Sequence, residues 1–157
     1  MNMEQRINVM EKGLKAMNAM AALGKHLSKS AVEFSLRELL YFRVSQINGC
    51  GFCLDMHSKE LIATGENAQR LFVLEAWREA PFYTEREQAA LAFAEELTHL
   101  SNNQVSDAVF SKLKEHFNDT DIIDLTLAIC TINSYNRINI ALGAPVGTYQ
   151  LGQFNHN

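Results

Sequence analysis

The sequence predicts an all-α protein, and three observations support this prediction. Apolar residues recur at intervals of three and four along the 157-residue chain, which is the period of an amphipathic helix. The chain contains two prolines and eight glycines, so few positions interrupt that pattern. No stretch shows the alternation of apolar and polar residues that is typical of a half-buried strand. We therefore expect a bundle of about seven helices in a single domain covering residues 1–157.

The N-terminal half is expected to be helical up to Pro81. A first amphipathic helix ends near Gly24. The second begins at Ser35, because Ser35-Leu36-Arg37-Glu38 fits a capping box. The third covers residues 51–64, with Gly65 placed just after its C-cap. The fourth stops before Pro81, since proline disfavours the helical conformation in the residue before it. The apolar face of the first helix carries Ile7, Met10, Leu14, Met17 and Ala21.

The C-terminal half shows similar helix signals. Thr84-Glu85-Arg86-Glu87 is a second capping box, and Ser106 caps the helix that follows. A last long helix runs from about residue 120 to Leu142. It is apolar on most faces, so we expect it at the centre of the bundle or at a subunit contact. The polar tail QLGQFNHN, residues 150–157, is expected to have little order of its own.

Charge and composition argue against several classes of protein. The chain has 18 acidic residues interspersed with 14 Lys and Arg, for a net charge of −4, and lacks a basic stripe for a phosphate backbone. We therefore expect no nucleic-acid partner. Charged residues in MNMEQRINVMEKGLK argue against a secretory signal, and no apolar run approaches the ~20 residues needed to cross a membrane. The expected location is the cytoplasm, where thiols are normally kept reduced.

The segment NGCGFCLDMHS, residues 48–58, places two of the three cysteines three residues apart and a histidine four further on. If a helix starts at the first cysteine, then Cys50, Cys53 and His57 share one face. The free N–H groups at a helix N-terminus stabilise a thiolate, which is the form that attacks peroxides and disulfides. His57 can take the proton of Cys53 directly or through a water. The spacing supplies a nucleophile, a base and a second thiol that can resolve the oxidised first one.

Other uses of the cysteine pair have to be weighed against this one. A structural zinc needs four ligands, and only Cys130 would add a third sulfur, so we expect no bound metal. Both cysteines of the pair can also lie inert in the core, because free cysteine is commonly buried. A thioredoxin fold is not expected, since a CxxC indicates that fold only beside a βαβ pattern.

Two further features accompany the cysteine motif. Glu38 lies twelve residues before Cys50, and the late segment INSYNRINIALG contains an Asn-x-x-Asn-Arg stretch. In these features the chain resembles the alkylhydroperoxidase D-like (AhpD-like) proteins of the carboxymuconolactone decarboxylase superfamily. The redox members of that family carry a glutamate, a CxxC and a histidine at the spacings of Glu38, Cys50, Cys53 and His57. The matching motifs cover most of residues 35–143.

The resemblance implies an AhpD-like bundle and an antioxidant thiol peroxidase that reduces organic hydroperoxides. It implies that Cys53 attacks the peroxide, that Cys50 closes the disulfide, and that Glu38 and His57 relay the proton that activates Cys53. A carboxylate behind an imidazole fixes the tautomer of the ring. No cofactor would be bound, and the reductant would be an external dithiol such as a lipoyl group on a partner protein. With apolar faces on the first and last helices, a homo-oligomer is expected, a trimer or a hexamer.

Several assignments have alternatives. Phe52 stands where some family members have a histidine, so any proton transfer by that residue is absent here. Glu38 is also the last residue of the capping box and can serve only to start its helix. Cys130 is expected to be a small core residue, and Asn136 and Arg137 to satisfy polar groups at a helix contact. A redox-sensing or disulfide-exchange protein without peroxide turnover, or a carboxymuconolactone decarboxylase-like lyase, is the alternative function.

Overall fold

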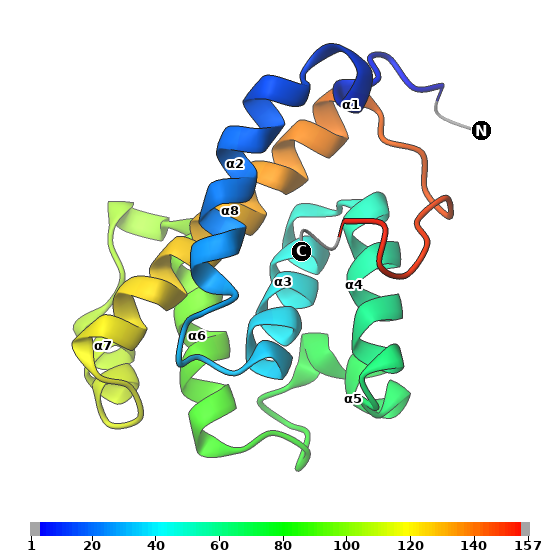
Figure 1. Cartoon of the computed structure of the whole chain (residues 1–157). Helices are drawn as coiled ribbons and strands as arrows, with labels where there is room; N and C mark the ends of the chain where they lie inside the picture. Colours follow the sequence, from blue (N-terminus) through cyan, green and yellow to red (C-terminus); the bar gives the residue numbers. More distant parts are fainter. Residues whose placement is uncertain (1–3, 155–157) are drawn as a thin grey trace.

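The computed structural model describes residues 4–154, and within this range it contains helices, turns and loops but no strand (Figure 1). The predicted all-α class is confirmed. None of the described helices is both long enough and apolar enough to cross a membrane. The α-helices are α1 (Val9–Lys12), α2 (Leu14–Leu27), α3 (Phe34–Asn48), α4 (Gly51–Ala63), α5 (Ala68–Phe72), α6 (Glu85–His99), α7 (Asp107–Lys114) and α8 (Asp119–Leu142), and the 3-10 helices are η1 (Leu74–Ala76) and η2 (Ser101–Asn103).

The long helix α8 lies at the centre of the bundle, as its apolar sequence predicts. It packs on α2, α3, α4, α6 and α7, and Figure 1 shows α2 running alongside it. Leu125, Ile129 and Ile132 on its buried face belong to the main core. Asn118 caps its start through the backbone N–H of Asp121, and Gly143, with a φ of 71°, ends it.

The first predicted helix is two helices in the structure. α1 and α2 meet at Gly13, which ends one and begins the other, and α2 continues past Gly24 to Leu27. Asn8 caps α1 by accepting hydrogen bonds from the backbone N–H groups of Met10 and Glu11. Glycine is a poor helix former, so it marks the break. The apolar period continues through the break, and spacing alone therefore did not reveal it.

Several other predicted helix boundaries are confirmed. Thr84 and Glu87 form the reciprocal capping box at the start of α6, and Ser106 caps α7 through the backbone of Val109. α4 covers nearly the predicted range and is followed by Gly65, which has a φ of 93°. In each case a local side-chain or glycine signal determines the boundary, which is why the sequence identifies it.

The predicted start of α3 at Ser35 is wrong. The helix begins at Phe34, Glu33 is the N-cap residue, and no side chain caps this end. The carboxylate of Glu38 does not return to the start of the helix, because it binds His57 instead. The capping role considered for Glu38 is therefore excluded by its position in the fold.

The sequence predicted the surroundings of three residues of α8. The prediction is confirmed for Asn136 and is wrong for Cys130 and Arg137. Cys130 is exposed and not a core residue, because the buried face of α8 runs through its neighbours Ile129 and Thr131. Asn136 is fully buried and donates to the Ser45 hydroxyl of α3, as expected for a polar group at a helix contact. Arg137 is exposed and bonds within its own helix, to the backbone and side-chain oxygens of Asn133.

The C-terminal segment is attached to the bundle through Tyr149, the residue just before the predicted tail, and through Phe154 within that tail. Figure 1 shows it returning from the end of α8 to α4. Tyr149 is buried, its hydroxyl bonds Glu60, and its carbonyl accepts a hydrogen bond from Lys59 at 3.0 Å. The ring of Phe154 stacks on that of Tyr149, with 5.7 Å between centroids. The rest of the predicted tail, residues 155–157, lies outside the described range, as do residues 1–3.

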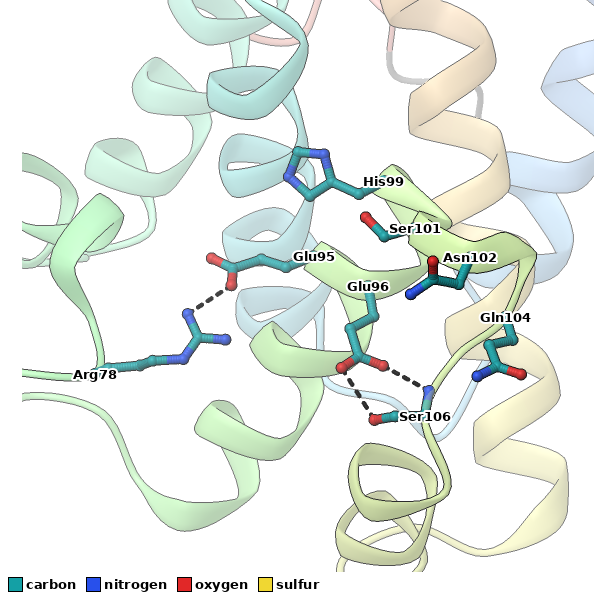
Figure 2. A pocket seen from close by; sticks show the side chains of 8 residues that line it. All are labelled: Arg78, Glu95, Glu96, His99, Ser101, Asn102, Gln104 and Ser106. Atoms are coloured by element: carbon teal, nitrogen blue, oxygen red, sulfur yellow. Dashed lines mark hydrogen bonds and ion pairs between the residues drawn. The ribbon is translucent and has the colours of Figure 1, made fainter.

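A buried carboxylate joins α3, α6 and the loop after η1. Glu95 accepts hydrogen bonds from Arg43 Nε at 2.8 Å, from Trp77 Nε1 at 2.9 Å and from Arg78 at 2.6 Å, the last shown in Figure 2. Burial opposes the charged form of Glu95, but these donors outweigh it and hold its pKa below the ordinary value of 4.5. Glu95 is therefore expected to be ionised in the folded protein near neutral pH.

Replacing Glu95 with glutamine is expected to lower the free energy of unfolding by about 3 kcal/mol at pH 7, because it leaves the buried charge of Arg43 unpaired. A folded-state pKa below the unfolded value gives stability above the unfolded pKa that is lost as pH falls through the folded pKa. The difference between variant and wild type should therefore shrink toward pH 3. Urea denaturation at both pH values measures it, and Glu79→Gln, at an exposed position, is the control. An equal difference in the free energy of unfolding at both pH values would contradict the conclusion that the pKa of Glu95 is lowered in the folded protein.

Candidate active site

The site begins with a sharp turn between α3 and α4. Gly49 has a φ of 68°, a left-handed conformation that glycine adopts without strain, and its N–H bonds the carbonyl of Gln46. The next N–H, that of Cys50, bonds the carbonyl of Ser45 at 3.1 Å. This turn places Cys50 at the N-cap of α4, the position that the sequence predicted.

Cys50 and Cys53 are joined as a disulfide, with 5.3 Å between their Cα atoms. The Sγ of Cys50 accepts the backbone N–H of Cys53 at 3.4 Å, so it sits at the positive end of the helix dipole. Each of the two residues is 1% exposed. A reaction at either sulfur therefore requires access through the side chains that cover them.

His57 lies on the next turn of α4 and is held by a carboxylate. Its Nδ1 is 2.6 Å from Oε2 of Glu38 on α3, and both residues are buried. A carboxylate accepts hydrogen bonds, so Nδ1 carries a proton, and in the neutral imidazole Nε2 has the free lone pair of a base. Nε2 is buried and has no hydrogen-bond partner among residues 4–154. The arrangement is that of an oriented imidazole that can accept a proton inside the bundle.

Tyr41 lies against this imidazole. The two ring centroids are 5.2 Å apart, with the rings tilted by 48°. Burial, with a further contribution from the negative charge of Glu38, raises the pKa of the Tyr41 hydroxyl well above its usual value. Tyr41 is therefore neutral across the physiological range. It contributes shape and packing beside His57 and is no second base.

Asn139 of α8 is a site residue that the sequence analysis did not identify. Its Nδ2 donates to the Sγ of Cys53 at 3.3 Å. Asn136 and Asn133 stand about one and two turns earlier on the same helix, and both accept hydrogen bonds from Asn48 at 2.9 Å. The repeated spacing of three in Asn-x-x-Asn-x-x-Asn was the available signal. It indicates a polar face of α8 directed at the corner of α3 and α4.

The structure thus brings the four predicted residues together as two contacting pairs on α3 and α4. Cys50 and Cys53 form one pair, and Glu38 and His57 form the other. Among residues 4–154 no three His, Cys, Asp or Glu side chains are grouped so that they would hold a metal ion. Phe52, where some members of the resembled family have a histidine, is half-buried next to Cys53 in the sequence.

A separate hollow of about 320 Å³ lies near the end of α6 (Figure 2), and neither Cys50 nor Cys53 lines it. It is polar, with Glu95 and Glu96 on one side and the residues around η2 on the other. Glu96 is occupied by the backbone N–H and hydroxyl of Ser106, and Glu95 by Arg78. The acidic side chains are therefore satisfied within the protein, and none of the four predicted site residues lines this hollow.

The C-terminal segment closes over the first turn of α4. A Cβ built on Gly51 would lie 2.9 Å from Cγ2 of Val146, closer than side chains normally approach. We therefore expect Gly51→Ala to lower the free energy of unfolding by about 1 kcal/mol through overpacking. Val146→Ala removes the obstructing methyl groups and is expected to restore most of the loss in the double variant. Thermal or urea denaturation of the four proteins in this cycle measures the coupling, and additive effects would contradict the contact.

Comparison with known proteins identifies the family. A family model described as "Carboxymuconolactone decarboxylase family" matches residues 14–96. The chain belongs to this family. The uncharacterised protein YdfG of Bacillus subtilis is 40% identical over 141 residues, which cover 90% of this chain and 96% of YdfG. The range matched by the family model, residues 14–96, contains Glu38, Cys50, Cys53 and His57 of this chain.

Solved structures agree with this assignment. A proposed antioxidant defence protein AhpD from Agrobacterium tumefaciens superposes with a TM-score of 0.88 at 35% identity, over 93% of this chain and all of that one. The chain described here is therefore an AhpD-like member of the family, as its motifs indicated. The debrominase Bmp8 superposes with a TM-score of 0.77 at 22% identity, over 88% of this chain and 75% of Bmp8. At that identity the likeness concerns the fold alone. The fold is one on which enzymes occur.

Proposed function

We propose that this protein is a thiol peroxidase that reduces organic hydroperoxides through Cys53 and Cys50. The observation that carries the proposal is the placement of the dithiol on α4 one turn before a histidine whose Nδ1 is fixed by Glu38 at 2.6 Å. A nucleophile, a second thiol and an oriented base on one buried face are the groups that such a reaction requires. The likeness to a protein of unknown function from Agrobacterium tumefaciens, itself proposed to be the antioxidant defence protein AhpD, supports this proposal.

The first step forms one bond and breaks another. His57 takes the proton of Cys53, directly or through a water, and the thiolate attacks the terminal oxygen of the hydroperoxide. The O–O bond breaks, Cys53 becomes a sulfenic acid, and the leaving alkoxide receives the proton from His57 to give an alcohol. The peroxide gains two electrons and the sulfur loses two. Glu38 keeps the imidazole in the required tautomer throughout.

The second step returns the site to the disulfide state. The thiol of Cys50 attacks the sulfenic sulfur of Cys53, which releases water and forms the bond present in the structure. An external dithiol, such as a lipoyl group on a partner protein, then reduces this disulfide by two thiol exchanges and becomes a disulfide itself. No bound cofactor is needed for the cycle. The side chains of Leu14, Ile123 and Ile140 are apolar and exposed, as expected of a surface that contacts other subunits. The proposal therefore includes a homo-oligomer, a trimer or hexamer. Its proposed location is the cytoplasm.

The experiment that tests the function is a turnover assay. Wild-type protein is incubated with cumene hydroperoxide and dihydrolipoamide, and loss of peroxide is followed over many equivalents. Steady consumption is expected. A single stoichiometric oxidation followed by no further reaction would reject the peroxidase and favour a redox sensor, and activity on a lactone acid that survives loss of both cysteines would favour a lyase.

A further inference from the structure

We propose that Asn139 stabilises the thiolate of Cys53 and thereby makes Cys53, and not Cys50, the more strongly charged sulfur of the reduced pair. The inference deepens the proposed function, on which it rests for its catalytic meaning. Its basis is the hydrogen bond from Asn139 Nδ2 to Cys53 Sγ, which spans 3.3 Å between α8 and α4.

The two sulfurs have different donors. Cys50 Sγ accepts the backbone N–H of Cys53, as a helix N-cap does, while Cys53 Sγ accepts the side-chain amide of Asn139. A disulfide sulfur carries no proton, so only the NH₂ end of the amide can bond to it, and this fixes the orientation of the amide. When the disulfide is reduced, the same donor faces a thiolate, to which hydrogen bonds are stronger.

The setting of Cys53 increases the importance of this donor. The residue is 1% exposed, so bulk water cannot readily replace a lost hydrogen bond. A hydrogen bond in such a low-dielectric environment is stronger than in water. The helix dipole acts most strongly at the N-terminus of α4, where Cys50 is the N-cap residue, and this favours the charge of Cys50. A specific donor on Cys53 is therefore what shifts the charge toward the second cysteine, where His57 can act at i+4.

Asn139 is held rigidly by the end of its helix. Its carbonyl accepts the N–H groups of Gly143 and of Ala144, the latter at 2.9 Å. Gly143 has a φ of 71°, and a Cβ there would lie 3.1 Å from the carbonyl of Glu4, so the turn is tightly packed. The main chain that carries the side-chain amide is therefore fixed before the charge forms, and the amide already donates to Cys53 Sγ in the disulfide state. Such a preorganised donor does not have to reorient when the thiolate appears.

The test follows the thiolate of Cys53 through the rate at which it is alkylated. In Cys50→Ser protein, in which serine can still cap α4, the rate of alkylation of Cys53 by iodoacetamide is followed across pH by peptide mass spectrometry. Peptide mapping separates Cys53 from the exposed Cys130. Asn139→Ala is expected to raise the pH midpoint of this reaction by about one unit, which is about a tenfold loss of thiolate at a fixed pH below it. Asn139→Asp keeps the shape but adds a negative charge and is expected to raise the midpoint further.

The controls separate this effect from folding and from the function itself. Asn18→Asp, at an exposed position on α2, adds the same charge away from the site and should leave the midpoint unchanged. Circular dichroism reports whether each variant folds, and the isosteric Asn139→Asp supplies the decisive comparison if the alanine variant does not. Unchanged midpoints in folded variants would overturn the proposal. A shifted midpoint in a protein that never turns over peroxide would leave this inference standing and reject the peroxidase.

Discussion

Replacing Cys53 with serine is expected to slow the reaction of the protein with cumene hydroperoxide by at least about a thousand-fold, since a hydroxyl at this position is a far poorer nucleophile than a thiolate. The thiol that remains in the pair, Cys50, lies at the N-cap of α4 and lacks the His57 partner at i+4, and the third thiol, Cys130, is exposed on α8. Rapid mixing with peroxide, followed by an acid quench and mass spectrometry with a sulfenic-acid trap, measures the loss.

The companion variant Cys50→Ser separates attack from resolution. It should react with the first equivalent of peroxide at nearly the wild-type rate, carry the trapped label on Cys53, and fail to turn over, because no second thiol can close the disulfide. Cys130→Ser, at the exposed third cysteine, should behave as wild type in both assays. If the label appears on Cys50 in the Cys53→Ser protein at the wild-type rate, the order of attack is the reverse of the one proposed.

Local signals in the sequence predicted the scaffold of the site. The start of α4 at Cys50 follows from Gly49, which ends α3, and the end of α4 follows from Gly65. Each of these two helix ends depends on a glycine in a backbone conformation that few other residues adopt. The glycines therefore indicate the helix ends without knowledge of the fold. The common face of Cys50, Cys53 and His57 follows from helix periodicity alone.

The contacts between helices were harder to predict. The position of Glu38 against His57 depends on how α3 packs on α4, and the capping motif at Ser35 offered a plain local use for the same carboxylate. The tertiary hydrogen bond prevailed because the buried imidazole provides the stronger partner. The burial of Cys130 was predicted wrongly for a related reason, since hydrophobicity all around α8 hides which face is inward.

The role of Asn139 shows where reasoning from the sequence alone ends. Its spacing from Asn136 places both on one face of α8, but nothing local indicates that this face meets a sulfur 86 residues earlier in the chain. The C-terminal segment is a similar case. Little order is predicted for residues 150–157, whereas Phe154 in that tail stacks on Tyr149, which Lys59 and Glu60 attach to α4 through contacts that exist only after the bundle has formed.

The contribution of the carboxylate is tested by Glu38→Gln, which removes the charge behind His57 and leaves the size of the side chain unchanged. An amide can accept or donate, so it no longer fixes the proton on Nδ1, and part of the protein will hold the wrong tautomer of the imidazole. We expect the first oxidation of Cys53 to slow by about a hundred-fold, in the range of general acid–base contributions. The control is Glu33→Gln at the N-cap of α3, which changes an ion pair with Arg86 outside the site.

A double variant decides whether the two residues act together. If Glu38 works only by orienting His57, then Glu38→Gln combined with His57→Asn should be no slower than His57→Asn alone, because the relay is already lost. Multiplied effects would show that Glu38 acts on Cys53 by another route. A Glu38→Gln protein that folds normally and keeps the wild-type rate would exclude the relay, and the helix dipole together with Asn139 would then be left to activate the thiol.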